Sequence, residues 1–315
     1  MGRRTAVLAA GILVGVGLVD LGCAHTPPIF DPSRRRTCLV LSAGGTRGVA
    51  HLGAIAAVRE AGVPVSCVVG ASVGALIGGL YASAPEQDTT ERFRRLTRAY
   101  LAATEEEAST RGLETGLVGA AIAAALSGGL LAPAGAAVGG FLLGAATTHR
   151  ADRARLEAVL RNELGAASIE RLPIAFASLH QERDGQGLAV VVDRTGDLAE
   201  AVGASIANPY IFDDVDVARA AKLDPGADRV AATPVHDACR AFPEANLLVV
   251  NLQPTPAIFG AHMTCPLREV MVPVDAVPPE ALFSDQPAFD AAWSAGHRAV
   301  RQALAMDASA PASGR

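Results

Sequence analysis

Aromatic residues, charged residues and lysine are all scarce in this 315-residue chain. Phe, Trp and Tyr make up 4% of the sequence, charged residues make up 19%, and Lys222 is the only lysine. A formal net charge of -5 disfavours a general nucleic-acid binder, which needs clustered cations to displace counterions from phosphates. Because half of the residues are hydrophobic, an intrinsically disordered chain is excluded. We expect a folded protein whose core is built from small and branched aliphatic side chains.

Metal-ligand spacing is missing as well. The five cysteines form no CxxC pair and give no signal for a zinc site. No metal or cofactor is expected. Cys38 and Cys67 fall in apolar runs that are typical of strands, and we interpret them as small buried hydrophobic residues. An oxidising compartment would permit a disulfide, but the sequence alone assigns no pairing.

The first 23 residues have the pattern of an export signal. Two arginines precede an uncharged apolar run, Ala6 to Val19, that is shorter than the roughly 20 residues of a membrane-spanning helix. Cys23 follows a small residue, as in a bacterial lipoprotein signal, although Asp20 departs from that pattern. We expect residues 1–23 to be a signal peptide or lipoprotein signal, with Cys23 as the lipidation candidate. The protein is then exported to the periplasmic face of a bacterial membrane, and an uncleaved anchor stays open as an alternative.

The rest of the chain divides into a tether, one domain and a tail. Residues 24–36 contain three prolines and are expected to be the tether. Residues 37–306 form the domain, and residues 307–315 are predicted to be a disordered tail. Within the domain, residues 115–148 are uncharged and interrupted by glycines and a proline. Two interpretations of this insertion stay open: a hydrophobic hairpin that dips into lipid, or a segment packed on the domain.

Apolar runs and helix-like patterns alternate along the domain, which indicates an α/β protein with parallel strands. The predicted strands are Thr37–Ser42, Val65–Val69, Pro173–His180, Leu188–Val192 and Asn246–Leu252. One predicted helix follows the first strand and ends near Gly62, and two others span Ser72–Ser83 and Ala288–Ala305. Between the third and fourth strands, the residues around Asp184-Gly185-Gln186-Gly187 are expected to form a hairpin turn.

The pentapeptide Gly70-Ala71-Ser72-Val73-Gly74 is the strongest local signal. It follows a predicted strand and opens a predicted helix, where a sharp turn can hold a nucleophilic serine clear of its sheet. Gly70 and Gly74 leave room on either side of Ser72. A tight turn with a capping serine is the alternative interpretation.

A second glycine-rich turn, Ser42 to Gly48, lies between the first predicted strand and its helix. It offers backbone amides that could cradle a phosphate or stabilise an oxyanion. A dinucleotide-binding motif is a weaker interpretation, because no clear acidic residue closes the second strand and a Walker-type lysine is missing. Because the two turns follow successive strands, they predict one shared site.

With these motifs, the chain resembles the patatin-like phospholipase family, particularly bacterial members related to neuropathy target esterase. Leu39–Ser83 carries most of the likeness, and Ala204–Phe212 resembles the stretch before the family's catalytic aspartate. Asp224–Ala227 occupies the place of that aspartate, and Thr233–Val235 follows as in the family. The resemblance spans most of Cys38–Leu252. It implies a patatin-like three-layer α/β/α sandwich with a mostly parallel central sheet.

The resemblance also implies an activity. Ser72 would attack an acyl ester, Asp224 would accept its proton, and an acyl-enzyme would form and be hydrolysed. The implied enzyme is a phospholipase A, lysophospholipase or esterase that acts on phospholipid or another acyl ester, with a membrane surface as an expected partner. The implied oxyanion loop consists of Gly44, Gly45, Thr46, Arg47 and Gly48.

Two departures from the family pattern bear on catalysis. Ala43 replaces the first glycine of the oxyanion loop, and Pro225 replaces the glycine after the aspartate. Proline fixes its own φ and lacks an amide hydrogen, so the turn at Asp224 would differ from that of the family. A catalytically silent lipid-binding or membrane-associated protein therefore stays open as the alternative function.

Other polar residues have competing interpretations. Asp228 is a second candidate for the base. His236 follows Ser72 and Asp224 in the order of an α/β-hydrolase triad, but several strands usually precede the serine in that fold, so we interpret His236 as a helix-surface or packing residue. A cluster of arginines could meet anionic headgroups, although a solvated helix face is the favoured interpretation. The cluster consists of Arg92, Arg94, Arg95 and Arg98.

Overall fold

The computed structural model describes residues 36–110, 153–184, 187–207, 222–227, 230–257, 263–275 and 287–309. The predictions for residues 1–35, for the lipidation of Cys23 and for the insertion at 115–148 lie outside the described residues, as do Asp228 and residues 208–212. None of the helices that the structure describes is long and apolar enough to cross a membrane.

A strand–helix–strand–helix unit begins the fold. Strand β1 (Thr37–Leu41) leads through the short helix η1 (Gly45–Gly48) into α1 (Val49–Glu60). Strand β2 (Val65–Ala71) then leads directly into α2 (Val73–Ser83) and pairs in parallel with β1. This unit confirms the predicted order of the first four elements, and it places both glycine-rich turns after parallel strands.

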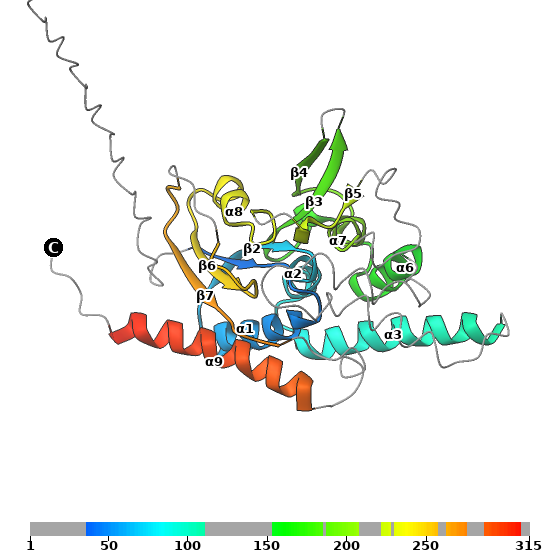
Figure 1. The fold of residues 1–315 in the computed structure, drawn as a ribbon, viewed down its shortest axis with the longest axis horizontal. Coiled ribbons are helices and arrows are strands. Elements are labelled where there is room, and N and C mark those ends of the chain that lie inside the picture. Colours follow the sequence, from blue (N-terminus) through cyan, green and yellow to red (C-terminus); the bar gives the residue numbers. More distant parts are fainter. Residues whose placement is uncertain are drawn as a thin grey trace, which may run out of the picture.

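The remaining elements complete a mixed sheet and its covering helices (Figure 1). They are α3 (Thr89–Thr110), α6 (Arg153–Leu164), η3 (Ile169–Arg171), β3 (Ala175–Asp184), β4 (Gly187–Asp193), α7 (Leu198–Ser205), β5 (Lys222–Leu223), η4 (Pro225–Ala227), α8 (Val235–Ala241), β6 (Asn246–Asn251), β7 (Leu267–Met271) and α9 (Pro287–Ser309). The predicted hairpin is the antiparallel pair β3–β4. The prediction omits β7, because its sequence Leu-Arg-Glu-Val-Met is not an apolar run. Helix α9 extends to Ser309, three residues into the predicted tail.

The strand order is β4-β3-β2-β1-β6-β7, and β5 pairs with β3 off this path. The pairs β3–β2, β2–β1, β1–β6 and β6–β7 are parallel, whereas β4 and β5 run antiparallel to β3. The carboxyl ends of the parallel strands therefore meet at one end of the sheet, where ligands and reactive groups gather in open α/β sheets.

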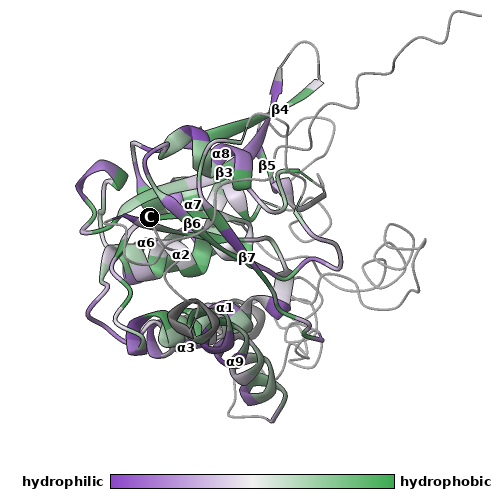
Figure 2. Cartoon of the chain, turned by 90° about the vertical axis from the view of Figure 1, so that its left-hand side faces the viewer, coloured by the Kyte–Doolittle hydropathy of each residue, from purple (hydrophilic) through white to green (hydrophobic). Residues whose placement is uncertain are grey.

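Helices cover both faces of the sheet, and Figure 2 shows α1, α3 and α9 on one side with α8 on the other. Leu39, Leu41 and Val68 point into the larger core on the first side. Val40 and Val69 point into a smaller core that includes α8 residues on the second side. The alternation along β1 and β2 follows from the period of two in a strand. The predicted three-layer α/β/α sandwich is confirmed.

Four cysteines are cross-linked in pairs. Cys38 and Cys67 are buried as predicted, but the prediction missed that they are bonded to each other. Cys38 and Cys67 are directly opposite each other in the β1–β2 register and form one disulfide. Cys239 on α8 forms a second disulfide with Cys265, which lies just before β7. The sequence could not assign either pair, because the pairing depends on strand register and on the docking of α8.

Candidate functional site

Ser72 occupies the turn between β2 and α2 in a backbone conformation that residues other than glycine rarely adopt. Its φ of 54° makes it the only described non-glycine residue with a positive φ. Such strain costs about 1–3 kcal/mol and collects at functional sites. A Cβ atom at Gly74 would collide with the carbonyl of Leu41, and one at Gly70 would collide with the carbonyl of Gly74. The two glycines therefore allow the close approach that the strained turn requires.

The hydroxyl of Ser72 donates a hydrogen bond to a carboxylate from a distant part of the chain. Ser72 Oγ lies 2.6 Å from Oδ2 of Asp224, 152 positions later. Both residues are only 9% exposed. His236, the triad alternative, lies half-buried on α8. The observed contact of Ser72 is thus the one expected of a serine–aspartate pair.

Strand β3 explains why these two residues meet. Ala71, the last residue of β2, is opposite Leu179 on β3. Strand β5 pairs antiparallel with β3, and its residue Leu223 is opposite Gln181, which lies two residues beyond Leu179. Ser72 follows Ala71 and Asp224 follows Leu223, so β3 holds both turns at the same level of the sheet.

The carboxylate of Asp224 is held from several sides. Its Oδ1 accepts a hydrogen bond of 2.6 Å from the amide of Gly226, and its own amide donates to the carbonyl of Ala207 at 2.9 Å. Burial raises the pKa of Asp224 to about 6, against the smaller lowering effects of the hydrogen bonds from Ser72 and Gly226. Pro225 begins η4, and its missing N–H is not the group that bonds the carboxylate.

The glycine-rich loop approaches the elbow closely. Gly45 has a φ of 57°, which favours glycine. A Cβ atom at Gly48 would overlap the side chain of Val73, the residue after Ser72. The loop and the elbow thus lie against each other, as the spacing of the two turns predicts.

Three of the predicted loop amides differ from the others in their hydrogen bonding. The amides of Gly44, Gly45 and Thr46 donate no hydrogen bond to another residue in the part of the chain that the structure describes. The amide of Arg47 already donates to the carbonyl of Gly44 at 3.2 Å, and so does Arg47 Nε at the same distance. Of the five predicted loop residues, the first three therefore have backbone amides without an acceptor among the described residues.

Ala43, which departs from the family pattern, fits its position. Its side chain is buried in a small cluster with Ala71 and Ala232. Its amide donates to the carbonyl of Ala232 at 2.7 Å, and its φ is not positive. A glycine is therefore not required at this position, and the substitution leaves the loop anchored.

Two further residues hold the loop and escape the sequence analysis. His51 is completely buried and its Nε2 lies 2.9 Å from the carbonyl of Ser42. Burial lowers the pKa of His51 to about 4, so its ring is neutral at pH 7 and donates to that carbonyl. Gln253 Nε2 donates to the carbonyl of Ala43 at 2.5 Å. A histidine in the first turn of the helix that follows a glycine-rich loop is the signal that could have found the first contact.

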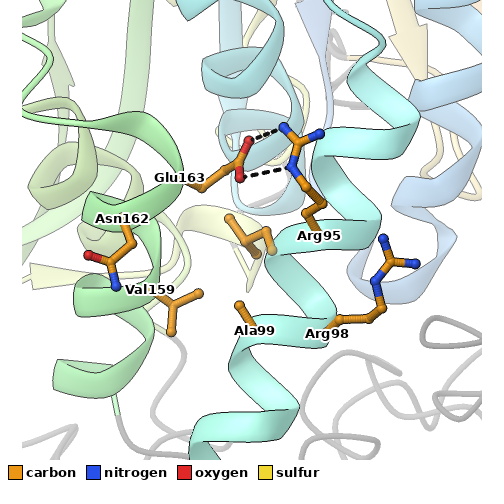
Figure 3. A pocket seen from close by; sticks show the side chains of 7 residues that line it. Arg95, Arg98, Ala99, Val159, Asn162 and Glu163 are labelled. Atoms are coloured by element: carbon orange, nitrogen blue, oxygen red, sulfur yellow. Dashed lines mark hydrogen bonds and ion pairs between the residues drawn. The ribbon is translucent and has the colours of Figure 1, made fainter.

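The arginine cluster on α3 is not a uniformly solvated face. Arg92 is 4% exposed and its Nε lies 2.9 Å from Oε1 of Glu163 on α6, so the solvated interpretation is wrong for this residue. Arg95 contacts the same carboxylate at 2.9 Å (Figure 3). A cavity of about 330 Å³ between the two helices is lined by Arg95, Leu96, Arg98, Ala99, Val159, Asn162 and Glu163. Its lining does not include Ser72 or Asp224.

The fold and the site define a class: three-layer α/β proteins that carry a serine on a strained strand–helix turn beside a glycine-rich loop. Within this class, the family model for patatin-like phospholipases matches residues 39–238. The match covers more than half of the chain, and the protein belongs to the patatin-like phospholipase family.

Curated relatives match over a short stretch. A lysophospholipase of Emericella nidulans is 58% identical over 66 residues, which is 19% of this chain and 4% of that protein. A patatin-like phospholipase domain-containing protein of Caenorhabditis elegans is 55% identical over 53 residues, 17% of this chain and 4% of that protein. The matched region is thus about 4% of the length of either relative.

Solved structures match over more of the chain but at low identity. ExoU of Pseudomonas aeruginosa, in complex with SpcU, has a TM-score of 0.42 and 16% identity, covering 90% of this chain and 52% of that one. VipD from Legionella pneumophila has a TM-score of 0.39 and 12% identity, covering 88% of this chain and 68% of that one.

Proposed function

We propose that this protein hydrolyses lipid acyl esters, with Ser72 as the nucleophile and Asp224 as the base. The observation that carries the proposal is the 2.6 Å hydrogen bond from Ser72 Oγ to Asp224 Oδ2, at the end of the sheet where the parallel strands finish. Membership of the patatin-like phospholipase family and the similarity to lysophospholipases support a lipid as the substrate.

In the first half of the reaction, Ser72 Oγ attacks the ester carbonyl carbon and Asp224 Oδ2 accepts the hydroxyl proton. The carbonyl oxygen becomes an oxyanion, and the unbonded amides at the start of η1 supply the donors that stabilise it. The proton on Asp224 then passes to the leaving alcohol as the ester bond breaks. The acyl group remains on Ser72.

In the second half, water takes the place of the alcohol. Asp224 accepts a proton from the water as it attacks the acyl-enzyme, and the fatty acid leaves when Ser72 Oγ recovers its proton. A carboxyl of ordinary pKa is a weak base, but burial raises the pKa of Asp224 to about 6. The raised pKa brings the base closer to the working pH, which favours proton transfer.

The alternative of a catalytically silent lipid binder is less well supported by the site. It depends on Ala43 and Pro225, the two departures from the family pattern. Ala43 has an ordinary φ and stays bonded to Ala232, while Gly226 supplies the amide that Pro225 lacks. Neither substitution removes a contact of the Ser72–Asp224 pair.

Export and membrane association are also proposed. The charge and apolar pattern of residues 1–23 supports export, and the disulfide between Cys239 and Cys265 suits an oxidising compartment. To test this, secreted protein is denatured without reductant and then alkylated. We expect both cysteines to remain unmodified because they are bonded to each other. Lipidation of Cys23 and lipid contact by residues 115–148 stay predictions.

Hydrolysis of lysophosphatidylcholine and of a soluble short-chain ester tests the proposed activity. We expect Ser72→Ala and Asp224→Asn each to lower turnover of both substrates at least about 1,000-fold. Matched controls are Ser66→Ala, at the opposite end of β2, and Asp88→Asn, where an asparagine can still accept the bonds of the α3 cap. Folded Ser72→Ala protein with full activity would refute the proposal. Near-total loss in His236→Ala would instead favour a triad.

A further inference from the structure

An edge strand of the sheet exposes apolar side chains beside the proposed active site. Residues 188–192 of β4 read Leu-Ala-Val-Val-Val, and β4 is the terminal strand of the sheet. Leu188 is 46% exposed and Val190 is 37% exposed. Exposed apolar residues on an unpaired edge are a liability in water, so natural proteins usually cover or charge such an edge.

The strand register places this apolar strand close to Asp224. Val190 is opposite Gln181 on β3, and Gln181 is in turn opposite Leu223 on β5. Because neighbouring strands lie about 4.8 Å apart, Val190 is about 10 Å from Leu223, the residue before Asp224. The apolar edge and the site therefore lie at the same level of the sheet.

The hairpin also extends beyond the level of Ser72. Strand β3 continues five residues past Leu179, the partner of Ala71, to Asp184, which is about 17 Å at the rise of a strand. Figure 1 shows the β3–β4 hairpin projecting from the body of the molecule. Val230, in the segment that follows the Asp224 turn, is another exposed apolar residue at 40%.

Charge on the hairpin does not favour one sign. The hairpin and the residue after it carry three acidic side chains, Glu182, Asp184 and Asp193, and two basic ones, Arg183 and Arg194. With no excess of positive charge, attraction to anionic lipid would contribute little to binding at this surface. Apolar contact is the interaction that the exposed side chains can offer.

We propose that the β3–β4 hairpin docks on a phospholipid surface through Leu188 and Val190 and thereby brings the Ser72–Asp224 site to its substrate. The choice of lipid as the occupant rests on the proposed lipid hydrolase function and on the position of the apolar edge beside the site. A long acyl ester resides in an aggregate, so the enzyme must reach the lipid interface before Ser72 can attack. Insertion of apolar side chains into that interface supplies the affinity.

Binding to vesicles tests the proposal without catalysis. Full-length protein carrying Ser72→Ala is sedimented with phosphatidylcholine vesicles, and the bound fraction gives a partition coefficient. Adding Leu188→Asp and Val190→Asp together is expected to lower this coefficient at least about tenfold. Met271→Asp is the matched control, because Met271 is 37% exposed on β7 at the opposite edge of the same sheet. Equal binding of the double variant and the control would overturn the proposal.

A fluorescence measurement reports the contact directly. Leu188→Trp is added to the Ser72→Ala protein, and the single native tryptophan, Trp293, serves as a constant background. We expect a blue shift of the emission on vesicle addition and quenching by brominated phosphatidylcholine, both little changed by salt. Bound protein with unchanged emission would contradict insertion of this strand.

A second copy of the chain is the competing occupant of the edge. If Leu188→Asp and Val190→Asp convert a dimer to a monomer and leave vesicle binding unchanged, the strand pairs protein copies and the lipid proposal is wrong. In protein with Ser72 intact, we expect the double variant to hydrolyse a soluble short-chain ester normally and vesicle lipid at least about tenfold more slowly. If the parent protein hydrolyses neither the soluble ester nor the vesicle lipid, the hydrolase function is refuted. The vesicle binding measurement would still decide whether the hairpin docks on lipid.

Discussion

The backbone amide of Ser72 donates a hydrogen bond of 2.9 Å to the hydroxyl of Ser205, 133 positions later. Ser205 is completely buried in the last turn of α7. The bond connects the strained elbow to the helix that packs on β3, and it gives an unusual backbone conformation a fixed partner. The turn between β2 and α2 is thus fixed to the end of α7 at the serine.

Replacing Ser205 by alanine is expected to weaken both the fold and the site. The amide of Ser72 would be left buried without an acceptor, which lowers the free energy of unfolding by about 1–3 kcal/mol. We expect hydrolysis to fall as well, because the elbow loses its partner. Ser178→Ala is the matched control, since Ser178 Oγ bonds the carbonyl of Ala201 on the same helix. Equal activity in the two variants would show that Ser205 serves stability alone.

The pH dependence of hydrolysis should follow the ionisation of Asp224. The base must be deprotonated to accept the proton of Ser72, and burial raises its pKa to about 6. We therefore expect kcat/KM for a soluble ester to rise with pH through about 6 and to level off above it. Activity that is constant from pH 4 to pH 8 would be incompatible with Asp224 as the base.

The stability of Asp224→Asn should differ from that of the parent protein in a pH-dependent way. The folded carboxyl has a pKa of about 6 against 3.8 as the reference value, so the native state binds its proton more tightly than the unfolded chain. The native state therefore loses stability as pH rises from about 4 to about 6, by up to about 3 kcal/mol. Asparagine removes this penalty. Denaturant unfolding of both proteins should show a difference that grows over this range; a pH-independent difference would contradict the raised pKa.

Much of this arrangement could be predicted from local sequence. The strand before Ser72, the helix after it and the two flanking glycines are adjacent in the chain, so the elbow is a local property of the sequence. The Asp224 turn follows only from the resemblance to a family. Its distance from Ser72 depends on the register of β5 on β3, and β5 consists of only two residues.

The contacts that hold the loop could not be predicted in the same way. Gln253 reaches the site from the segment after β6, and Ser205 reaches it from α7. Nothing in their neighbouring residues indicates a partner 133 or more positions away. The cysteine pairs depend on register in the same sense. The burial of Arg92 cannot be predicted from its neighbours either, because its partner, Glu163, comes from a helix that follows the long insertion in the sequence.

Backbone strain at Gly45 offers a test of the glycine-rich loop. Alanine at a φ of 57° is expected to cost about 1–2 kcal/mol of unfolding free energy and to disturb the amides at the start of η1. Gly62→Ala is a close control, because Gly62 has a φ of 65° and no neighbouring atom within 4 Å of an added Cβ. We expect similar thermal destabilisation in both variants and loss of hydrolysis only in Gly45→Ala. Full activity in Gly45→Ala would exclude the loop from oxyanion stabilisation.

The most direct test is the reaction of the folded protein with a fluorophosphonate probe, followed by peptide mass spectrometry. We predict a single adduct on Ser72, labelling slowed at least about 100-fold in Asp224→Asn and no adduct in Ser72→Ala. Folded protein that stays unlabelled, or an adduct on another residue, would contradict a nucleophilic Ser72 activated by Asp224.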